Sequence, residues 1–152
     1  MVSNSTGMHV GGRRTPWHLW IVGALGLLCN AYGGFDYVRL KTRGDAYLQS
    51  VGMTPEQIAH LNAMPPWMTA VWAIGVWGAL LGAVLLLARS RYAVPAFVAS
   101  LAAYVLSLVY AYLIAPMPGS TPALMAFQLV ILAGCVFFAW YAMRARSRGW
   151  LR

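Results

Sequence analysis

The chain has 152 residues, of which 61% are hydrophobic and 9% are charged, and its mean hydropathy is +0.64. A soluble domain needs far more charge to cover its surface, so the composition indicates an integral membrane protein. The formal net charge of +8 does not indicate nucleic-acid binding. The basic residues stand at the ends of apolar segments, where anionic lipid head groups are their expected partners.

The first apolar stretch follows a basic tail. Residues 1–14 are rich in Gly and Ser and end in two arginines, which predicts a cytoplasmic tail with a basic anchor. Residues 15–40 predict the first span, because about 20 mostly apolar residues at about 1.5 Å each cross a hydrocarbon core of about 30 Å. Small residues recur on one face of this helix and let a second helix come close. These predicted packing positions are Gly23, Gly26 and Gly33.

The second half of this span is the predicted site of specific contact. An amide, a carboxylate, two adjacent glycines and three aromatic rings come together where the helix nears the far interface. Polar groups at that depth are retained only when something satisfies them. Rings beside a carboxylate are typical of contacts with carbohydrates or organic cations. The candidate solute-binding residues are Asn30, Tyr32, Phe35, Asp36 and Tyr37.

Each of these residues also has a structural interpretation. The Asn30 amide can hydrogen-bond to a neighbouring helix, since such bonds commonly join membrane helices. Its predicted partners are Gln128, Ser107 or Tyr104. Asp36 can pair with Arg39, three residues later on the helix. The rings can belong to an interfacial aromatic belt, and the glycine pair leaves open whether the helix continues.

Residues 41–64 are the long polar stretch of the chain and predict a helical hairpin outside the membrane. Thr54 and Gln57 have the spacing of a capping box at the start of its second helix. That helix is expected to lie along the bilayer surface. Its apolar side consists of Ile58, Leu61 and Met64.

Three further spans are predicted at residues 67–88, 93–114 and 122–143, followed by a basic cytoplasmic tail at 144–152. The second span repeats the pattern of small residues, which predicts close packing against the first span. Its packing positions are Gly75, Gly78 and Gly82. The last two spans carry isolated polar side chains on apolar helices. These are Ser100, Tyr104, Ser107 and Gln128.

Lys and Arg are divided unevenly between the two ends of the spans. Eight of the eleven lie in the two tails and the 89–91 turn, and the other three lie within 39–43. Cytoplasmic loops carry the excess of positive residues. Both termini are therefore expected in the cytoplasm, and the 41–64 hairpin is expected on the other side.

The sequence lacks the motifs of catalysis and of bound metals. It has no nucleophile elbow, zinc motif, phosphate loop or dinucleotide fingerprint. Glu56 and His60 are four residues apart and could begin a metal site, but convincing third and fourth ligands are lacking. His18, near the inner interface, is expected to contact lipid head groups. We therefore expect a protein that is not an enzyme and that holds no metal and no cofactor.

Several stretches carry a resemblance to a known family. They are TPWHLW at 15–20, NAYGGFDY at 30–37, TPEQ at 54–57, PW at 66–67 and WAIGVWG at 72–78. Together they resemble a small four-span inner-membrane family of proteobacteria whose members are commonly labelled "sugar transporter". The match is close over residues 15–95 and looser afterwards, and Cys29 stands where the family usually has an aromatic residue. The resemblance implies an inner-membrane location and transport, and it brings no catalytic residues.

The sequence as a whole predicts an all-α fold. This is an integral membrane four-helix bundle with a short extracytoplasmic helical hairpin between the first two spans. Two functions remain open. The chain could transport or bind a small solute, with a sugar as one candidate, and a transporter of four spans is expected to form a homodimer. Alternatively, it could be a non-catalytic accessory or assembly subunit of a larger complex, bound to a partner membrane protein.

Overall fold

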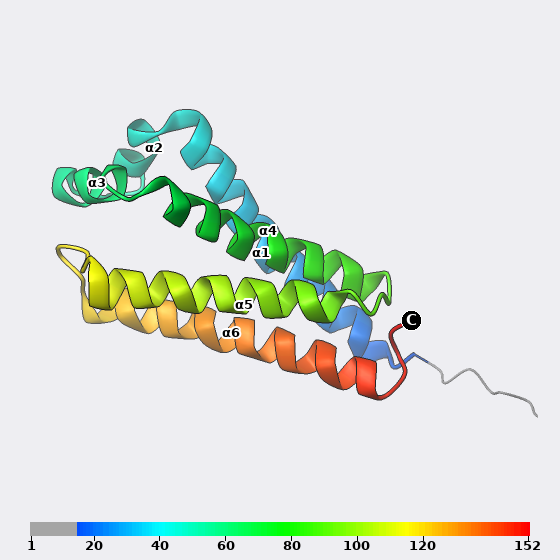
Figure 1. The fold of residues 1–152 in the computed structure, drawn as a ribbon. Coiled ribbons are helices and arrows are strands. Elements are labelled where there is room, and N and C mark those ends of the chain that lie inside the picture. The colour runs from blue at the N-terminus through cyan, green and yellow to red at the C-terminus, as the bar shows by residue number, and fades with distance from the viewer. Residues whose placement is uncertain (1–14) are drawn as a thin grey trace, which may run out of the picture.

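The structure, a computed structural model, describes residues 15–152, so the predicted tail at 1–14 lies outside the described residues. The described chain is helical throughout (Figure 1). Its elements are α1 (Trp17–Arg43), α2 (Asp45–Ser50), α3 (Pro55–Asn62), α4 (Pro66–Leu87), α5 (Ala93–Val109), the π-helix η1 (Tyr110–Ile114) and α6 (Pro122–Ser147). Four helices in this part of the chain are long and apolar enough to cross a membrane, with α5 and η1 forming one of them. The predicted fold class is confirmed.

Two of the long helices extend beyond their predicted ends. The first span continues without a break through the Gly33–Gly34 pair and ends at Arg43 rather than residue 40. It stops at Gly44, whose φ of 54° is in the left-handed region that favours glycine, and the Gly44 amide donates to the Leu40 carbonyl at 2.8 Å. The last span runs to Ser147, so the first four residues of the predicted basic tail are helical.

The two ends of the bundle are built differently (Figure 1). We call the end that holds the 89–91 turn and the last turn of α6 the basic end, and the end that holds α2 and α3 the hairpin end. Figure 1 shows α4 close to α5 at the basic end and separating from it toward the hairpin end. The main buried cluster draws on α1, α4, α5 and α6 together with the last residues of the chain. Its members are Leu19, Ala83, Leu86, Ala93, Phe97, Ala139, Tyr141, Ala142, Ala145 and Leu151.

Small residues set the helix distances, but the glycines of the first two spans do not face each other as expected. The α4 glycines face α5 instead. A Cβ placed on Gly82 would lie 2.9 Å from the Phe97 ring, and one on Gly78 would lie 3.3 Å from the Ser100 Cβ. The Ser100 hydroxyl also donates to the Gly75 carbonyl at 2.6 Å. The central helix α4 packs against both α1 and α5, and its glycine face is the one turned to α5.

The glycines of α1 each meet a different environment. A Cβ on Gly23 would meet the Leu87 side chain of α4, and one on Gly26 would lie 2.9 Å from the Phe138 ring of α6. Within the described residues, nothing lies within 4 Å of a Cβ placed on Gly33. Gly34 next to it is buried, and a Cβ placed there would lie 3.7 Å from the Leu80 side chain of α4. The closest approaches to α1 glycines are thus at Gly23 and Gly26, in its half nearer the basic end.

The last residues of the chain close the basic end. The Arg152 amide donates to the Arg89 carbonyl at 2.6 Å, and the Arg91 amide donates to the Arg152 carbonyl at 2.8 Å. Arg89 has a left-handed φ of 58°, which is unfavourable for a residue with a Cβ, and its Nε donates to the Trp150 carbonyl at 3.2 Å. These bonds hold the turn between α4 and α5 in place.

His18 is part of this closed end. Its Nδ1 lies 2.6 Å from the Tyr141 hydroxyl of α6, and its ring packs edge-on against Trp150 at 5.3 Å between centroids. The sequence predicts a head-group contact for this residue. The structure instead places its ring between α1, α6 and the end of the chain.

Candidate functional site: a cavity beneath the α2–α3 hairpin

A cavity of about 530 Å³ lies at the hairpin end. Every helix of the described chain contributes to its lining. The polar lining residues are Lys41, Asp45, Asn62, Thr69, Tyr104, Ser107 and Gln128. The larger apolar and aromatic ones are Met64, Met68, Trp72, Tyr110 and Met117. This mixture of apolar walls with a small number of polar groups is typical of small-molecule sites.

The roof of the cavity is the short helix α3. Its start is fixed by the predicted capping box, which is confirmed: the Thr54 amide donates to Gln57 Oε1 at 3.1 Å, and the Gln57 amide donates to Thr54 Oγ1 at 3.3 Å. Gln57 Nε2 also donates to the Pro118 carbonyl at 3.2 Å, which joins the hairpin to the loop between η1 and α6. The apolar side of α3 was expected to lie on the bilayer surface. Leu61 and Met64 instead line the cavity, so this side covers the mouth of the bundle.

Two side-chain hydrogen bonds hold the hairpin to α1 and to itself. The Tyr47 hydroxyl of α2 donates to the Asp36 carboxylate of α1. Asn62 Nδ2 of α3 donates to Asp45 Oδ1 of α2 at 3.0 Å. The hydrogen bond to Asp36 raises the pKa of Tyr47 above its ordinary value, because it favours the protonated phenol. The roof is thus held by these polar contacts together with one buried apolar side chain from each short helix, Leu48 of α2 and Ile58 of α3.

The side of the cavity between α5 and α6 is organised by Gln128. The Tyr104 hydroxyl donates to the Gln128 backbone carbonyl at 3.1 Å, and the Tyr112 hydroxyl donates to the Gln128 side-chain oxygen at 2.7 Å. Among residues 15–152, the side-chain nitrogen of Gln128 makes no hydrogen bond and is a free donor. The π-helical turn places Tyr110 and Ala111 in the lining, and such turns recur at functional sites.

The five predicted solute-binding residues lie outside this lining. Asn30 Nδ2 donates to the Gly26 carbonyl of its own helix at 2.6 Å, so its bond is not to another helix. Tyr32 is 73% exposed, and Phe35 is exposed with the Arg39 guanidinium 4.4 Å from its ring centroid. Tyr32 and Phe35 lie on the same side of α1 as Asp36, whose carboxylate holds the hairpin through Tyr47.

Tyr37, one of the five predicted residues, packs against a residue that lines the cavity. Its ring packs edge-on against Trp72 at 5.2 Å and against Trp77 at 6.2 Å between centroids. Because Trp72 lines the cavity, Tyr37 supports the wall from behind. A solute contact at the five predicted residues stays a prediction.

Sequence reasoning missed most of the cavity, although one signal pointed to it. Tyr104 and Ser107 share a face of the third predicted span, and Gln128 is the one amide of the fourth. Polar side chains on two neighbouring apolar helices are costly unless they face each other or a wet space. The contribution of Thr69 and Trp72 had no comparable signal.

Residues 15–152 contain no group of three or more His, Cys, Asp or Glu side chains that could hold a metal ion. Glu56 is exposed, and the buried His60 Nε2 has no hydrogen-bond partner among the described residues. Cys29 and Cys135 are both free thiols. What the cavity offers to a ligand, by its lining, is hydrogen-bonding groups and aromatic surface.

Comparisons with protein-family models, with curated proteins and with solved structures find no match to this chain. What the fold establishes is a polytopic membrane protein with four candidate spans and a cavity at one end.

Proposed function

We propose that the chain binds a small polar solute in the cavity beneath the hairpin, as the binding stage of solute transport across a bacterial inner membrane. The observation that carries this proposal is the cavity itself, whose 530 Å³ is within the range of small-molecule sites. Its polar groups can orient a solute, and its rings can cover an apolar face. In this proposal the chain is a binding protein and not an enzyme.

A sugar is the favoured solute class. Trp72 offers a ring on which an apolar sugar face can stack, while Thr69, Asn62 and Gln128 offer donors and acceptors for hydroxyl groups. The resemblance of residues 15–95 to a four-span family labelled "sugar transporter" supports the same class. The packed cluster at the basic end separates the cavity from the opposite side, so transport requires that cluster to rearrange.

The distribution of positive charge indicates the side of the membrane from which the cavity would bind its solute. Eight of the eleven Lys and Arg residues stand at the basic end or in the tails, which favours cytoplasmic termini and a cavity open to the periplasmic side. Labelling of a single cysteine introduced at Gln49 in intact cells tests this orientation. A membrane-impermeant reagent should react at that position and should not react with a cysteine introduced at Arg146.

The binding proposal is tested with purified protein in detergent and a panel of sugars, polyols, amino acids and organic cations. At least one sugar should raise the thermal midpoint. Gln128→Leu should weaken the binding of that sugar about tenfold. One hydrogen bond is worth about 1 kcal/mol, and the sugar hydroxyl that paired with Gln128 is left without a partner in the site. The matched control is Asn30→Leu, which makes a similar amide-to-apolar change outside the lining and should leave affinity within about twofold.

Two results would count against this proposal, and one control helps to interpret them. If no compound of the panel shifts the midpoint, the cavity is not a site for these solutes. A larger loss with Asn30→Leu than with Gln128→Leu would return the site to the 30–37 segment. The midpoint of each variant without solute separates loss of binding from loss of the Tyr104 and Tyr112 contacts to Gln128.

An accessory or assembly subunit is the second candidate function. The observation that favours it is the exposure of α6. Of an 18-residue apolar stretch of this helix, 6% of the residues are buried against the rest of the described chain, compared with 22% in each of the other three spans. A larger partner could cover this helix. Stable co-purification of a second membrane protein, lost with bulky polar substitutions along α6, would support this function over solute binding.

A further inference from the structure

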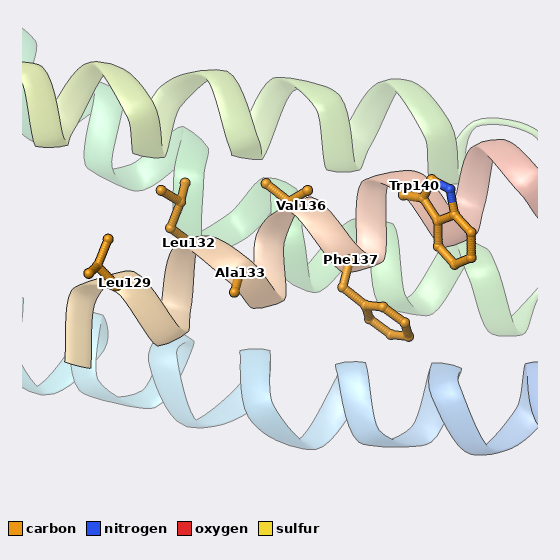
Figure 2. A pocket seen from close by; sticks show the side chains of 6 residues that line it. All are labelled: Leu129, Leu132, Ala133, Val136, Phe137 and Trp140. Carbon is orange, nitrogen blue, oxygen red and sulfur yellow. The ribbon is translucent and has the colours of Figure 1, made fainter. Parts of the chain in front are cut away.

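A shallow apolar groove runs along α6 (Figure 2). Figure 2 shows its side chains on consecutive turns of the helix. They are Leu129, Leu132, Ala133, Val136, Phe137 and Trp140. Their spacing of three and four residues puts them on one face, and the small Ala133 makes the hollow among larger neighbours. This face is open, because α6 buries little of its apolar surface against the rest of the described chain.

We infer that this groove is the seat of an anionic phospholipid, with one acyl chain along α6 and the phosphate at Arg144. The first argument is length. From Leu129 to Trp140 the helix rises about 16 Å, at about 1.5 Å per residue. That is about half of a hydrocarbon core of about 30 Å, which is the depth of one leaflet. The groove therefore matches a single acyl chain rather than a structure that spans the bilayer.

The second argument is the charge at the end of the groove. Arg144 continues the same helix face, one turn beyond Trp140, and its guanidinium lies 5.6 Å from the Trp140 ring centroid. The ring holds the exposed cation over the end of the groove, at the depth where tryptophan marks the head-group region. A planar guanidinium binds a phosphate through two parallel hydrogen bonds.

A second copy of the chain is a poorer occupant. Two copies joined through this face about an axis normal to the membrane would bring their Arg144 side chains together, and like charges at an interface are unfavourable. Membrane helix interfaces also favour small residues, whereas five of the six groove residues are Leu, Val, Phe or Trp. An acyl chain fits around such side chains without a matching surface.

The test compares lipid retention on the purified full chain by native mass spectrometry, with phosphatidylglycerol and phosphatidylcholine as probes. Phosphatidylglycerol should be retained in preference. Arg144→Gln should lower its retention about fivefold, and Arg144→Lys should restore most of it. The matched control is Arg146→Gln. That residue is also exposed and stands two positions on, about 200° around the helix, so its loss should change retention less than twofold.

A second variant tests the groove without touching the charge. Ala133→Phe fills the hollow at an exposed position where folding does not depend on the side chain, and it should lower retention of phosphatidylglycerol while Arg144 remains. Equal losses for the two arginine variants, or equal retention of the two lipids, would reduce the groove to ordinary lipid-facing surface and overturn the inference. So would a dimer that Ala133→Phe dissociates. None of these outcomes bears on solute binding in the cavity at the hairpin end.

Discussion

The basic end and the hairpin end of the bundle use the same helices for opposite purposes. Near the basic end, α4 and α5 meet through glycine and alanine, as where the Phe97 ring fills the space above Gly82. Toward the hairpin end the same two helices carry Thr69, Trp72 and Tyr104, whose side chains line a cavity. Small residues let backbones approach, and larger polar ones hold them apart. One end is therefore a scaffold, and the other is the place where a ligand can enter.

The largest expected effect tests the scaffold end. Leu86→Ala should lower the free energy of unfolding by about 2 kcal/mol, because it removes the packing contacts of a buried leucine. This value is at the low end of the range for buried leucines, since an unfolded membrane helix stays in lipid and only the packing contacts are lost. Leu86 is fully buried, while Leu81 on the same helix is 54% exposed. Leu81→Ala should cost less than about 0.5 kcal/mol. Unfolding by SDS titration measures both, and similar losses would mean that the basic end is not the better-packed one.

A pair of glycine substitutions of opposite sign sharpens the same contrast. Gly82→Ala should lower the free energy of unfolding by about 1 kcal/mol, because the new Cβ would overlap the buried Phe97 ring. The cost of this overlap exceeds the gain in helix propensity from glycine to alanine. Gly33→Ala should stabilise by about 0.5 kcal/mol, since a Cβ there meets nothing within 4 Å in residues 15–152. The same SDS titration applies. A loss at Gly33 would show that this glycine serves a close contact.

Local patterns in the sequence were enough to predict the spans and the capping box. Apolar runs of membrane length and the spacing of Thr54 with Gln57 depend on neighbours along the chain, and both are found in the structure. The faces of the glycines could not be predicted, because Gly26 and Gly82 have similar surroundings in sequence yet meet α6 and α5. Helical periodicity fixes which residues share a face and leaves open which helix that face meets.

The candidate site was harder to predict for a related reason. Residues 30–37 attracted attention because polar and aromatic groups are dense there, yet α1 continues as a helix and divides them between two faces, with Tyr32, Phe35 and Asp36 on one and Asn30 and Tyr37 on the other. The cavity draws residues from every helix, and Thr69, unlike Gln128, has no distinguishing signal in its own segment. The link between Asp36 and Tyr47 exists only because Gly44 turns the chain back.

A smaller effect is expected from the one buried serine of the α4–α5 contact. Ser100 is 3% exposed, and its hydroxyl donates to the Gly75 carbonyl at 2.6 Å. Ser100→Ala should cost about 0.6 kcal/mol, the average for polar contacts between membrane helices. Ser107→Ala is the control, because that hydroxyl donates to the Ala103 carbonyl within its own helix. A cost for Ser107→Ala as large as for Ser100→Ala would mean that the interhelical bond adds nothing.

The smallest expected effect is a pH dependence confined to the hairpin. The pKa of Tyr47 is raised in the folded chain above the ordinary value of 10.0, chiefly by its hydrogen bond to Asp36. A group with a raised pKa contributes stability that is complete below its unfolded pKa and is lost as pH rises through the folded one. The hairpin should therefore stay closed up to about pH 10 and open above it.

Spin labels at Gln49 and Ser120, two exposed positions on the hairpin and on the loop before α6, report this opening in a chain whose two cysteines are replaced by alanine. Their distance distribution should lengthen between pH 8 and pH 11 in the otherwise unchanged protein. Tyr47→Phe lacks the titrating hydroxyl and its bond to Asp36, so it should show an open fraction already at pH 8 and little further change. If Tyr47→Phe opened over the same pH range as the unchanged protein, the Tyr47 hydroxyl would not be the group that controls the opening.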